Sequence, residues 1–424
     1  MTRFTAAVYQ NEFLAMGATD VHAVVTVAAA DVRPAAETID AAEIVIIDES
    51  GSMATPGAKL RAAKEATAAA IDTIRNGVAF AVIAGSDRVR TIYPSEGLAI
   101  ASSETRAEAK EAVRKVRALG GTAIGTWLTR ARELFETAPA GVRHAILLTD
   151  GQNQHETHAE LEEALEACAG VFQCDCRGVG TDWEVAELRL IASRLLGTVD
   201  IVADPEGLAA DFRAMTARAM GRGTADVALR VWTPRGATVS FVKQVAPTIE
   251  DLTDRATPVD DLTSDYPTGV WGDESRDYHV SVDVTPRGAG DEMLAARISL
   301  VVEGQVVAQG LVRAIWTEDA ELSTRINPEV AHYTGQAELA EVIQEGLEAR
   351  RAGDEAAATC KLGRAVQLAS DSGNDGTLQL LGRVLEIDDA PTGTVRLKSH
   401  VEDVDEMSLD TRSTRTVRVG GSGP

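Results

Sequence analysis

The chain has 424 residues, which is too long for one ordinary hydrophobic core and predicts two or three domains. Hydrophobic residues make up 45% and charged residues 25%, as in folded globular proteins, and the formal charge of −24 argues against binding nucleic acid or an anionic membrane. No apolar run reaches the roughly 18 residues of a membrane-spanning helix, and the N-terminal MTRFTAAVYQNEF lacks the apolar stretch of a secretory signal. The four cysteines are too few and too clustered for a disulfide framework (Cys168, Cys174, Cys176 and Cys360). We therefore expect a reduced, cytoplasmic protein.

The first half of the chain predicts a β-hairpin followed by an α/β domain. Residues 1–38 are expected to form the hairpin, with strands at 3–9 and 21–28. From 41 to 220, short apolar runs alternate with helical patterns, which predicts a doubly wound (Rossmann-like) domain with a parallel sheet. The strands are expected at 43–48, 79–85, 144–150, 171–180 and 198–203, the helices at 57–76, 104–118, 125–137, 157–169 and 183–196, and an antiparallel edge strand at 88–94.

The second half of the chain has a different pattern. Residues 225–318 alternate apolar and polar side chains with a period of two, which predicts a β-sandwich of antiparallel strands. The N-terminal hairpin is expected to complete it, so that the α/β domain is inserted in the sandwich. Residues 325–388 predict a helical segment of two or three helices, and residues 389–424 are rich in charge and poor in apolar side chains, which predicts a disordered tail.

Polar side chains with hard oxygen atoms follow several of the predicted strands. The sequence IVIIDESGSM places Asp48, Ser50 and Ser52 in the loop that leaves the first parallel strand. Thr122 follows a double glycine at a helix start, and Asp150 ends the strand ILLTD. Ligands of open parallel sheets bind beyond the carboxyl ends of the strands, where these loops meet. Two carboxylates and three hydroxyls suit Mg²⁺ and leave it with residual positive charge, so a carboxylate from outside the chain can complete its coordination.

This set of residues resembles the metal-ion-dependent adhesion site (MIDAS) of von Willebrand factor A (VWA) domains, of a bacterial cytoplasmic type. The resemblance covers about residues 41–220, and the motif positions Asp48, Ser50, Ser52, Thr122 and Asp150 occur in the family's order. It implies that Mg²⁺ or Mn²⁺ binds there. It further implies that the two serines are direct ligands, that the two aspartates act mainly through water, and that Thr122 joins when a carboxylate binds. We expect Gly51 and Gly121 to let the backbone approach the ion.

Other interpretations of these residues are less favoured. Asp48 with Ser50 is also typical of a helix N-cap or a turn, and Glu49 is expected to be a solvated neighbour. His155 and His158 have a spacing that zinc can use, but a polar helix start accounts for them. A Mg²⁺-dependent phosphohydrolase needs a second aspartate where this chain has Ser50, and neither serine has the glycines of a hydrolase nucleophile. The expected protein is therefore not an enzyme.

The resemblance implies a protein–protein recognition module whose partner presents an exposed Asp or Glu side chain. An alternative is an adaptor for an AAA+ ATPase of the MoxR or chelatase type. The tail adds a second expectation, a signalling role in which threonines beside arginines are phosphorylated and bound by a phosphothreonine reader (Thr411, Thr414 and Thr416).

Overall fold

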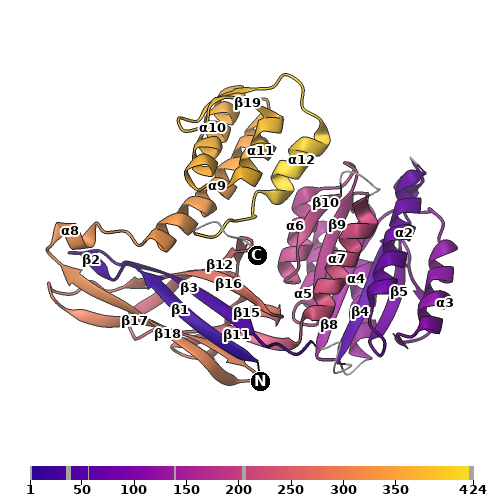
Figure 1. Ribbon diagram of the computed structural model, residues 1–424, viewed down its shortest axis with the longest axis horizontal. Coiled ribbons are helices and arrows are strands. Elements are labelled where there is room, and N and C mark those ends of the chain that lie inside the picture. Colours follow the sequence, from indigo (N-terminus) through magenta and orange to yellow (C-terminus); the bar gives the residue numbers. More distant parts are fainter. Residues whose placement is uncertain (1, 35–39, 56, 138–139, 203–206, 420–424) are drawn as a thin grey trace. The chain divides into compact units, whose positions relative to one another are not determined.

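The computed structural model describes residues 2–34, 40–55, 57–137, 140–202 and 207–419, and the chain divides into two compact units (Figure 1). The first unit comprises residues 32–225 and 270–272. The second comprises residues 2–31, 226–269 and 273–424.

The first unit is built on one sheet with the strand order β10-β9-β8-β4-β5-β6, and a short strand, β7 (Ala99–Ile100), also pairs with β5. The central strands are parallel, and β6 and β7 run antiparallel to β5, which confirms the edge strand expected at 88–94. In sheet order the main strands are β10 (Val199–Val202), β9 (Gln173–Val179), β8 (Val142–Thr149), β4 (Ala41–Asp48), β5 (Ala79–Gly85) and β6 (Val89–Tyr93). This fold class is the predicted doubly wound one.

Helices cover both faces of this sheet (Figure 1). Side chains alternate between the faces of a strand, so Val45 and Ile47 of β4 point to one face and Ile44 and Ile46 to the other, and all four are buried. The first face packs against α2 (Ala58–Thr73), α3 (Ser103–Arg114) and α7 (Leu208–Gly221). The other helices are α4 (Ile124–Glu136), α5 (His158–Cys168) and α6 (Val185–Arg194).

The order of the strands fixes where ligand-binding loops meet. After β4 the chain adds β5 on one side of β4, and it later adds β8 on the other side. The connections that leave β4 and β8 therefore run to opposite sides. The crevice between them at the carboxyl edge of the sheet is the usual ligand site in this fold class.

The second unit contains two mostly antiparallel sheets that form a sandwich (Figure 1). One has the order β1-β3-β16-β12-β13 and the other β14-β15-β11-β17-β18-β2. The N-terminal segment supplies β1 and β3 to the first sheet and β2 to the second, so the α/β unit lies in the chain between strands of one sandwich. The strands are β1 (Arg3–Gln10), β2 (Phe13–Ala15), β3 (Asp20–Ala30), β11 (Thr224–Trp232), β12 (Ala237–Ala246), β13 (Glu250–Asp251), β14 (Thr257–Asp260), β15 (Thr263–Trp271), β16 (Glu274–Val284), β17 (Glu292–Val302) and β18 (Gln305–Thr317).

The C-terminal segment is folded along most of its length. After α8 (Ala320–Ser323), the helices α9 (Pro328–Arg351), α10 (Glu355–Asp371) and α11 (Asp375–Val384) share a core with the hairpin of β19 (Leu385–Asp389) and β20 (Thr394–Leu397). Helix α12 (Asp403–Arg412) adds the fully buried Leu409 to that core, and Arg351 forms ion pairs with its Glu406 and Asp410. The prediction of a disordered tail is thus wrong for residues 389–419, because a few well-placed apolar side chains and ion pairs hold this polar segment. Residues 420–424 lie outside the described residues.

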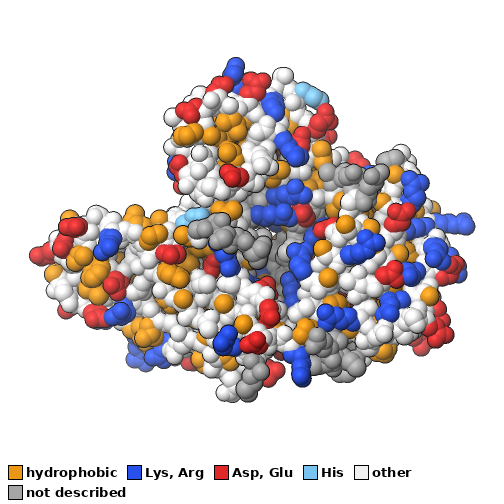
Figure 2. Space-filling view, in the orientation of Figure 1, with side chains coloured by type: hydrophobic (Ala, Val, Ile, Leu, Met, Phe, Trp, Pro, Cys, Tyr) orange, Lys and Arg blue, Asp and Glu red, His pale blue; other side chains and the backbone are white. Residues whose placement is uncertain are grey.

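On the face shown in Figure 2, acidic and basic side chains are interspersed. In the described part of the chain, no helix is both long and apolar enough to cross a membrane.

Candidate metal centre

Three loops of the first unit bring the five predicted metal ligands to one place. The loop after β4 carries Asp48, Ser50 and Ser52 and continues into the short 3-10 helix η1 (Gly51–Ala54). The loop before α4 carries Thr122 and is joined to it, since Gly51 N–H donates to Gly120 O at 2.9 Å and Leu119 N–H donates to Glu49 O at 2.6 Å. Asp150 directly follows β8, which ends at Thr149.

Asp48 is fully buried and both of its oxygen atoms accept hydrogen bonds. Oδ1 accepts from Ser50 N–H at 2.7 Å, and Oδ2 accepts from the Thr149 hydroxyl at 2.6 Å. Burial raises the pKa of Asp48 to about 6 although these hydrogen bonds favour its ionised form. A carboxylate fixed in this way positions the loop and suits an outer-shell role toward a cation.

The two serine hydroxyls and Asp150 form a contiguous row of oxygen atoms. Ser50 Oγ lies 2.9 Å from Ser52 Oγ, and Ser52 Oγ donates to Asp150 Oδ1 at 2.6 Å. Two ligands at right angles, each about 2.0–2.1 Å from Mg²⁺, lie about 2.9 Å apart, so the serine pair has the spacing of one octahedral edge. Across the described residues, no three His, Cys, Asp or Glu side chains gather around a possible metal position, so an ion here must rely on hydroxyls. The donor set therefore fits Mg²⁺ or Mn²⁺, and metal binding itself stays a prediction.

Thr122 reaches the same place and is held by His155. A Cβ built on Gly151 would lie 3.1 Å from Ser52 Oγ and 3.5 Å from Thr122 Oγ1, so both hydroxyls approach this glycine. The backbone N–H of Thr122 donates to the ring Nδ1 of His155 at 3.2 Å, and the backbone N–H of His155 donates to Thr122 O at 2.9 Å. His155 thus positions Thr122, while His158 lies in α5 beside Glu162 at 3.6 Å.

The two motif glycines lie close to other protein groups, and their expected approach to the ion stays a prediction. A Cβ on Gly121 would lie 1.9 Å from the ring of His155, and a Cβ on Gly51 would lie 3.3 Å from Gly120 O. Their small size therefore lets protein groups pack together around the loops. Glu49 is not the solvated neighbour that was expected, since its side chain is buried. The guanidinium of Arg90 donates to Glu49 Oε1 at 2.9 Å and to Glu49 Oε2 at 2.6 Å.

Two residues beside the centre were not predicted from the sequence. Thr149 bonds Asp48, as described above, and Lys59 Nζ donates to Asp150 Oδ2 at 2.8 Å. Lys59 is the second residue of α2. A cation in the first turn opposes the helix dipole, and this unusual placement is the signal that could have marked Lys59.

The tail threonines are packed against the rest of the second unit. Thr411 lies in α12 and is 2% exposed, and the Thr416 hydroxyl donates to Val245 O at 2.6 Å. Thr414 O accepts Ile249 N–H at 2.8 Å. Phosphorylation of these threonines stays a prediction, and it requires this segment to open first.

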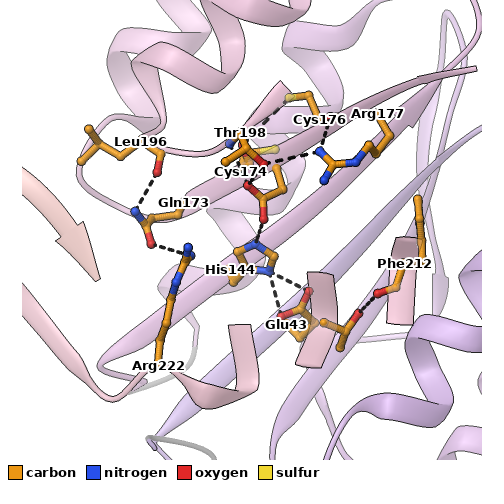
Figure 3. Close-up of polar contacts among 12 residues, drawn as sticks. Glu43, His144, Gln173, Cys174, Cys176, Arg177, Leu196, Thr198, Phe212 and Arg222 are labelled. Atoms are coloured by element: carbon orange, nitrogen blue, oxygen red, sulfur yellow. Dashed lines mark hydrogen bonds and ion pairs between the residues drawn. The ribbon is translucent and has the colours of Figure 1, made fainter. Parts of the chain in front are cut away.

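A second polar cluster lies at the opposite end of the strands (Figure 3). His144 of β8 lies between Glu43 of β4 (Nδ1 to Oε1 and Oε2 at 2.9 and 3.0 Å) and Asp175 of β9 (Nε2 to Oδ2 at 3.1 Å). All three are buried. Burial lowers the pKa of His144, but the two carboxylates outweigh it and raise the pKa to about 9. The cysteines near this cluster, Cys174 and Cys176, are buried free thiols.

Comparisons with known proteins agree with this architecture. Residues 42–201 match the family described as von Willebrand factor type A domain, and residues 367–413 match the von Willebrand factor type A C-terminal domain. The structure of "von Willebrand factor type A from Catenulispora acidiphila" is 51% identical, with 98% of this chain and 97% of that chain covered and a TM-score of 0.94. A search of curated proteins returned no match.

Two more distant structures share the fold. The ArnB paralog VWA2 from Sulfolobus acidocaldarius is 15% identical, with 98% of each chain covered and a TM-score of 0.60. The human COPII-coat protein Sec24c is 12% identical, with 89% of this chain and 57% of that chain covered and a TM-score of 0.54. The identity over nearly the whole length of the Catenulispora protein, together with both family matches, shows that this chain belongs to the von Willebrand factor type A family.

Proposed function

We propose that this protein is a non-catalytic recognition module that holds Mg²⁺ or Mn²⁺ at Ser50 and Ser52 and uses it to bind an acidic side chain of a protein partner. The observation that carries the proposal is the row of oxygen atoms from Ser50 to Asp150, with the 2.9 Å serine spacing. Bound there, the ion supplies a Lewis-acidic site for a carboxylate. The residues supply the rest: Ser50 and Ser52 as direct ligands, Asp48 and Asp150 as outer-shell acceptors, and Thr122 as the ligand that joins when the partner binds.

An exposed apolar side chain beside the loops supports a protein partner. Leu119 is 77% exposed and stands directly before Gly120, which accepts the N–H of Gly51. A large apolar side chain exposed next to a charged site is typical of an interaction surface, because a partner can bury it around the ionic contact.

A metal titration tests the first half of the proposal. We expect Mn²⁺ or Mg²⁺ to raise the melting temperature of the wild type, since a ligand at 100 times its Kd stabilises the folded state by about 2.7 kcal/mol. The Asp48→Ala variant should show no such rise, whereas the surface variant Asp72→Ala, which removes an exposed acid of α2, should respond like the wild type. Equal responses of the wild type and Asp48→Ala would refute the assignment.

Affinity capture from the native host tests the partner. A protein retained by the wild type with Mg²⁺ should be lost with EDTA, with Ser52→Ala and with Leu119→Ser. Leu119→Ser should keep the metal-dependent rise in melting temperature. Recovery of an AAA+ ATPase would favour the adaptor role, and a partner retained equally in EDTA would refute recognition through the metal.

A further inference from the structure

A buried ammonium group borders the proposed metal centre. Lys59 Nζ lies 2.8 Å from Asp150 Oδ2 and 2.7 Å from Asp182 Oδ2. The side chain of Lys59 is 8% exposed and that of Asp150 is 0% exposed, whereas Asp182 is 66% exposed. The ion pair with Asp150 is therefore shielded from water, and the one with Asp182 is screened.

The surrounding chain holds Lys59 in its charged form. Burial lowers the pKa of Lys59, but the hydrogen bonds and charges of Asp150 and Asp182 outweigh it, so the pKa is raised. Gly180, with φ +73°, passes close to the side chain, and a Cβ there would lie 3.2 Å from Lys59 Cε. The ammonium is thus a fixed positive charge in contact with one of the proposed outer-shell carboxylates.

Both oxygen atoms of Asp150 are engaged by the protein. Oδ1 accepts from Ser52 and Oδ2 accepts from Lys59. The buried Glu49 is neutralised by its ion pair with Arg90, so the remaining buried charges at the centre are −1 on Asp48, −1 on Asp150 and +1 on Lys59, which sum to −1. A divalent ion brings the sum to +1, whereas without Lys59 the loaded centre would be neutral.

We propose that Lys59 sets the charge of the centre, so that it weakens binding of the divalent ion and strengthens binding of a partner's carboxylate to the loaded centre. This inference rests on the function proposed above and adds how its selectivity is controlled. A carboxylate neutralises a loaded centre of charge +1. The positive charge of Lys59, which makes the loaded centre positive, also repels the metal ion. A purely structural Lys59 would instead affect both affinities in the same direction, or neither.

The Lys59→Met variant separates these possibilities. Mn²⁺ binding is measured by calorimetry, and acetate, the simplest carboxylate, is titrated into the Mn²⁺-loaded protein while loss of inner-sphere water is followed by proton relaxation. We expect Lys59→Met to bind Mn²⁺ at least about tenfold more tightly and acetate at least about threefold more weakly than the wild type. Arg61→Met, which removes an exposed positive charge from the same helix, should match the wild type in both. Unchanged or weaker Mn²⁺ binding by Lys59→Met would overturn the inference.

Two further variants keep the test decisive if Lys59→Met folds poorly. Lys59→Arg keeps the charge and should keep both affinities near those of the wild type. Asp182→Asn removes the exposed carboxylate that faces Lys59, so it should shift both affinities in the opposite sense to Lys59→Met, with weaker Mn²⁺ and tighter acetate binding. Failure of the wild type to bind Mn²⁺ would overturn the proposed function and this inference together. If the wild type binds Mn²⁺ and the Lys59→Met and Asp182→Asn variants both have its Mn²⁺ and acetate affinities, only this inference is overturned.

Discussion

At the scale of single residues, the imidazole of His144 makes the protein's stability depend on pH. It is buried between Glu43 and Asp175, and the two carboxylates raise its pKa to about 9 from an ordinary value near 6.5. A raised histidine pKa contributes stability that is fully present below about pH 6.5 and is lost as the pH rises through about 9.

We predict that the wild type loses about 3 kcal/mol of unfolding free energy between pH 6.5 and 9.5 on account of His144. The His144→Gln variant should be less stable at pH 6.5 and should lack most of this slope. Urea unfolding at each pH gives the free energies. A variant with the same slope as the wild type would assign the pH dependence to other groups.

Residues differ in how far the sequence alone can predict them. The five oxygen donors were predictable because a spaced motif and the strand ends mark them, and the structure brings them together. Lys59 and His155 were not, because each contacts its partner through a side chain whose direction depends on how separate loops pack. The two hydrogen bonds between His155 and Thr122 have no periodic signature in the sequence.

At the scale of elements, the segment after α12 is hydrogen-bonded to the loop of the sandwich around residues 245–249. Thr416 N–H donates to Pro247 O at 3.1 Å, Ile249 N–H donates to Thr414 O at 2.8 Å, and His332 Nε2 lies 2.7 Å from Val417 O. With the Thr416 hydroxyl bond to Val245 O, these make four hydrogen bonds from this segment to the rest of the second unit, and Arg418 adds a bond to Ser275 O and an ion pair with Asp277 at 3.5 Å.

We predict that truncation after Ser413 lowers the unfolding free energy of the second unit by about 2–4 kcal/mol, since each bond contributes about 1 kcal/mol. Proteolysis should then cleave near residues 245–255 faster than in the full chain. A truncation after Val419 keeps all four bonds and serves as the control. Equal cleavage of both truncated proteins would show that the segment does not stabilise the loop.

The elements that the sequence predicted best are those with a strong period. The parallel strands and the helices between them follow apolar runs and 3.6-residue patterns. Helix α7 was not predicted because alanines dilute its apolar stripe, although Phe212, Met215 and Ala219 are buried. Helix α12 was missed because its ion pairs with Arg351 join residues that are more than fifty positions apart.

At the scale of the whole molecule, the N-terminal strand β3 pairs with β16, which begins at Glu274, more than 240 residues after β3 ends at Ala30. β3 lies between β1 and β16 and pairs with β16 from Asp20 to Ala29, and Val21, Ala23, Val25 and Val27 are buried. This pairing was predictable in outline, because residues 225–318 left a sandwich without enough strands. Its register was not, since the alternation of both strands allows several offsets.

We predict that deletion of residues 2–31 unfolds the sandwich and leaves the first unit intact. The deletion exposes the edge of β16 and its buried face, so the protein should aggregate. Limited proteolysis should release a fragment of about residues 40–225 that still binds Mn²⁺. A soluble, monomeric deletion protein whose second unit resists protease would contradict this expectation.

The insertion of one unit into the other also has a mechanical consequence. The chain crosses between the units near residues 31–32 and 225–226, and it crosses again on either side of residues 270–272. A pulling force applied to the first unit is therefore shared between these connections, whereas in a serial two-domain chain one linker carries all of it.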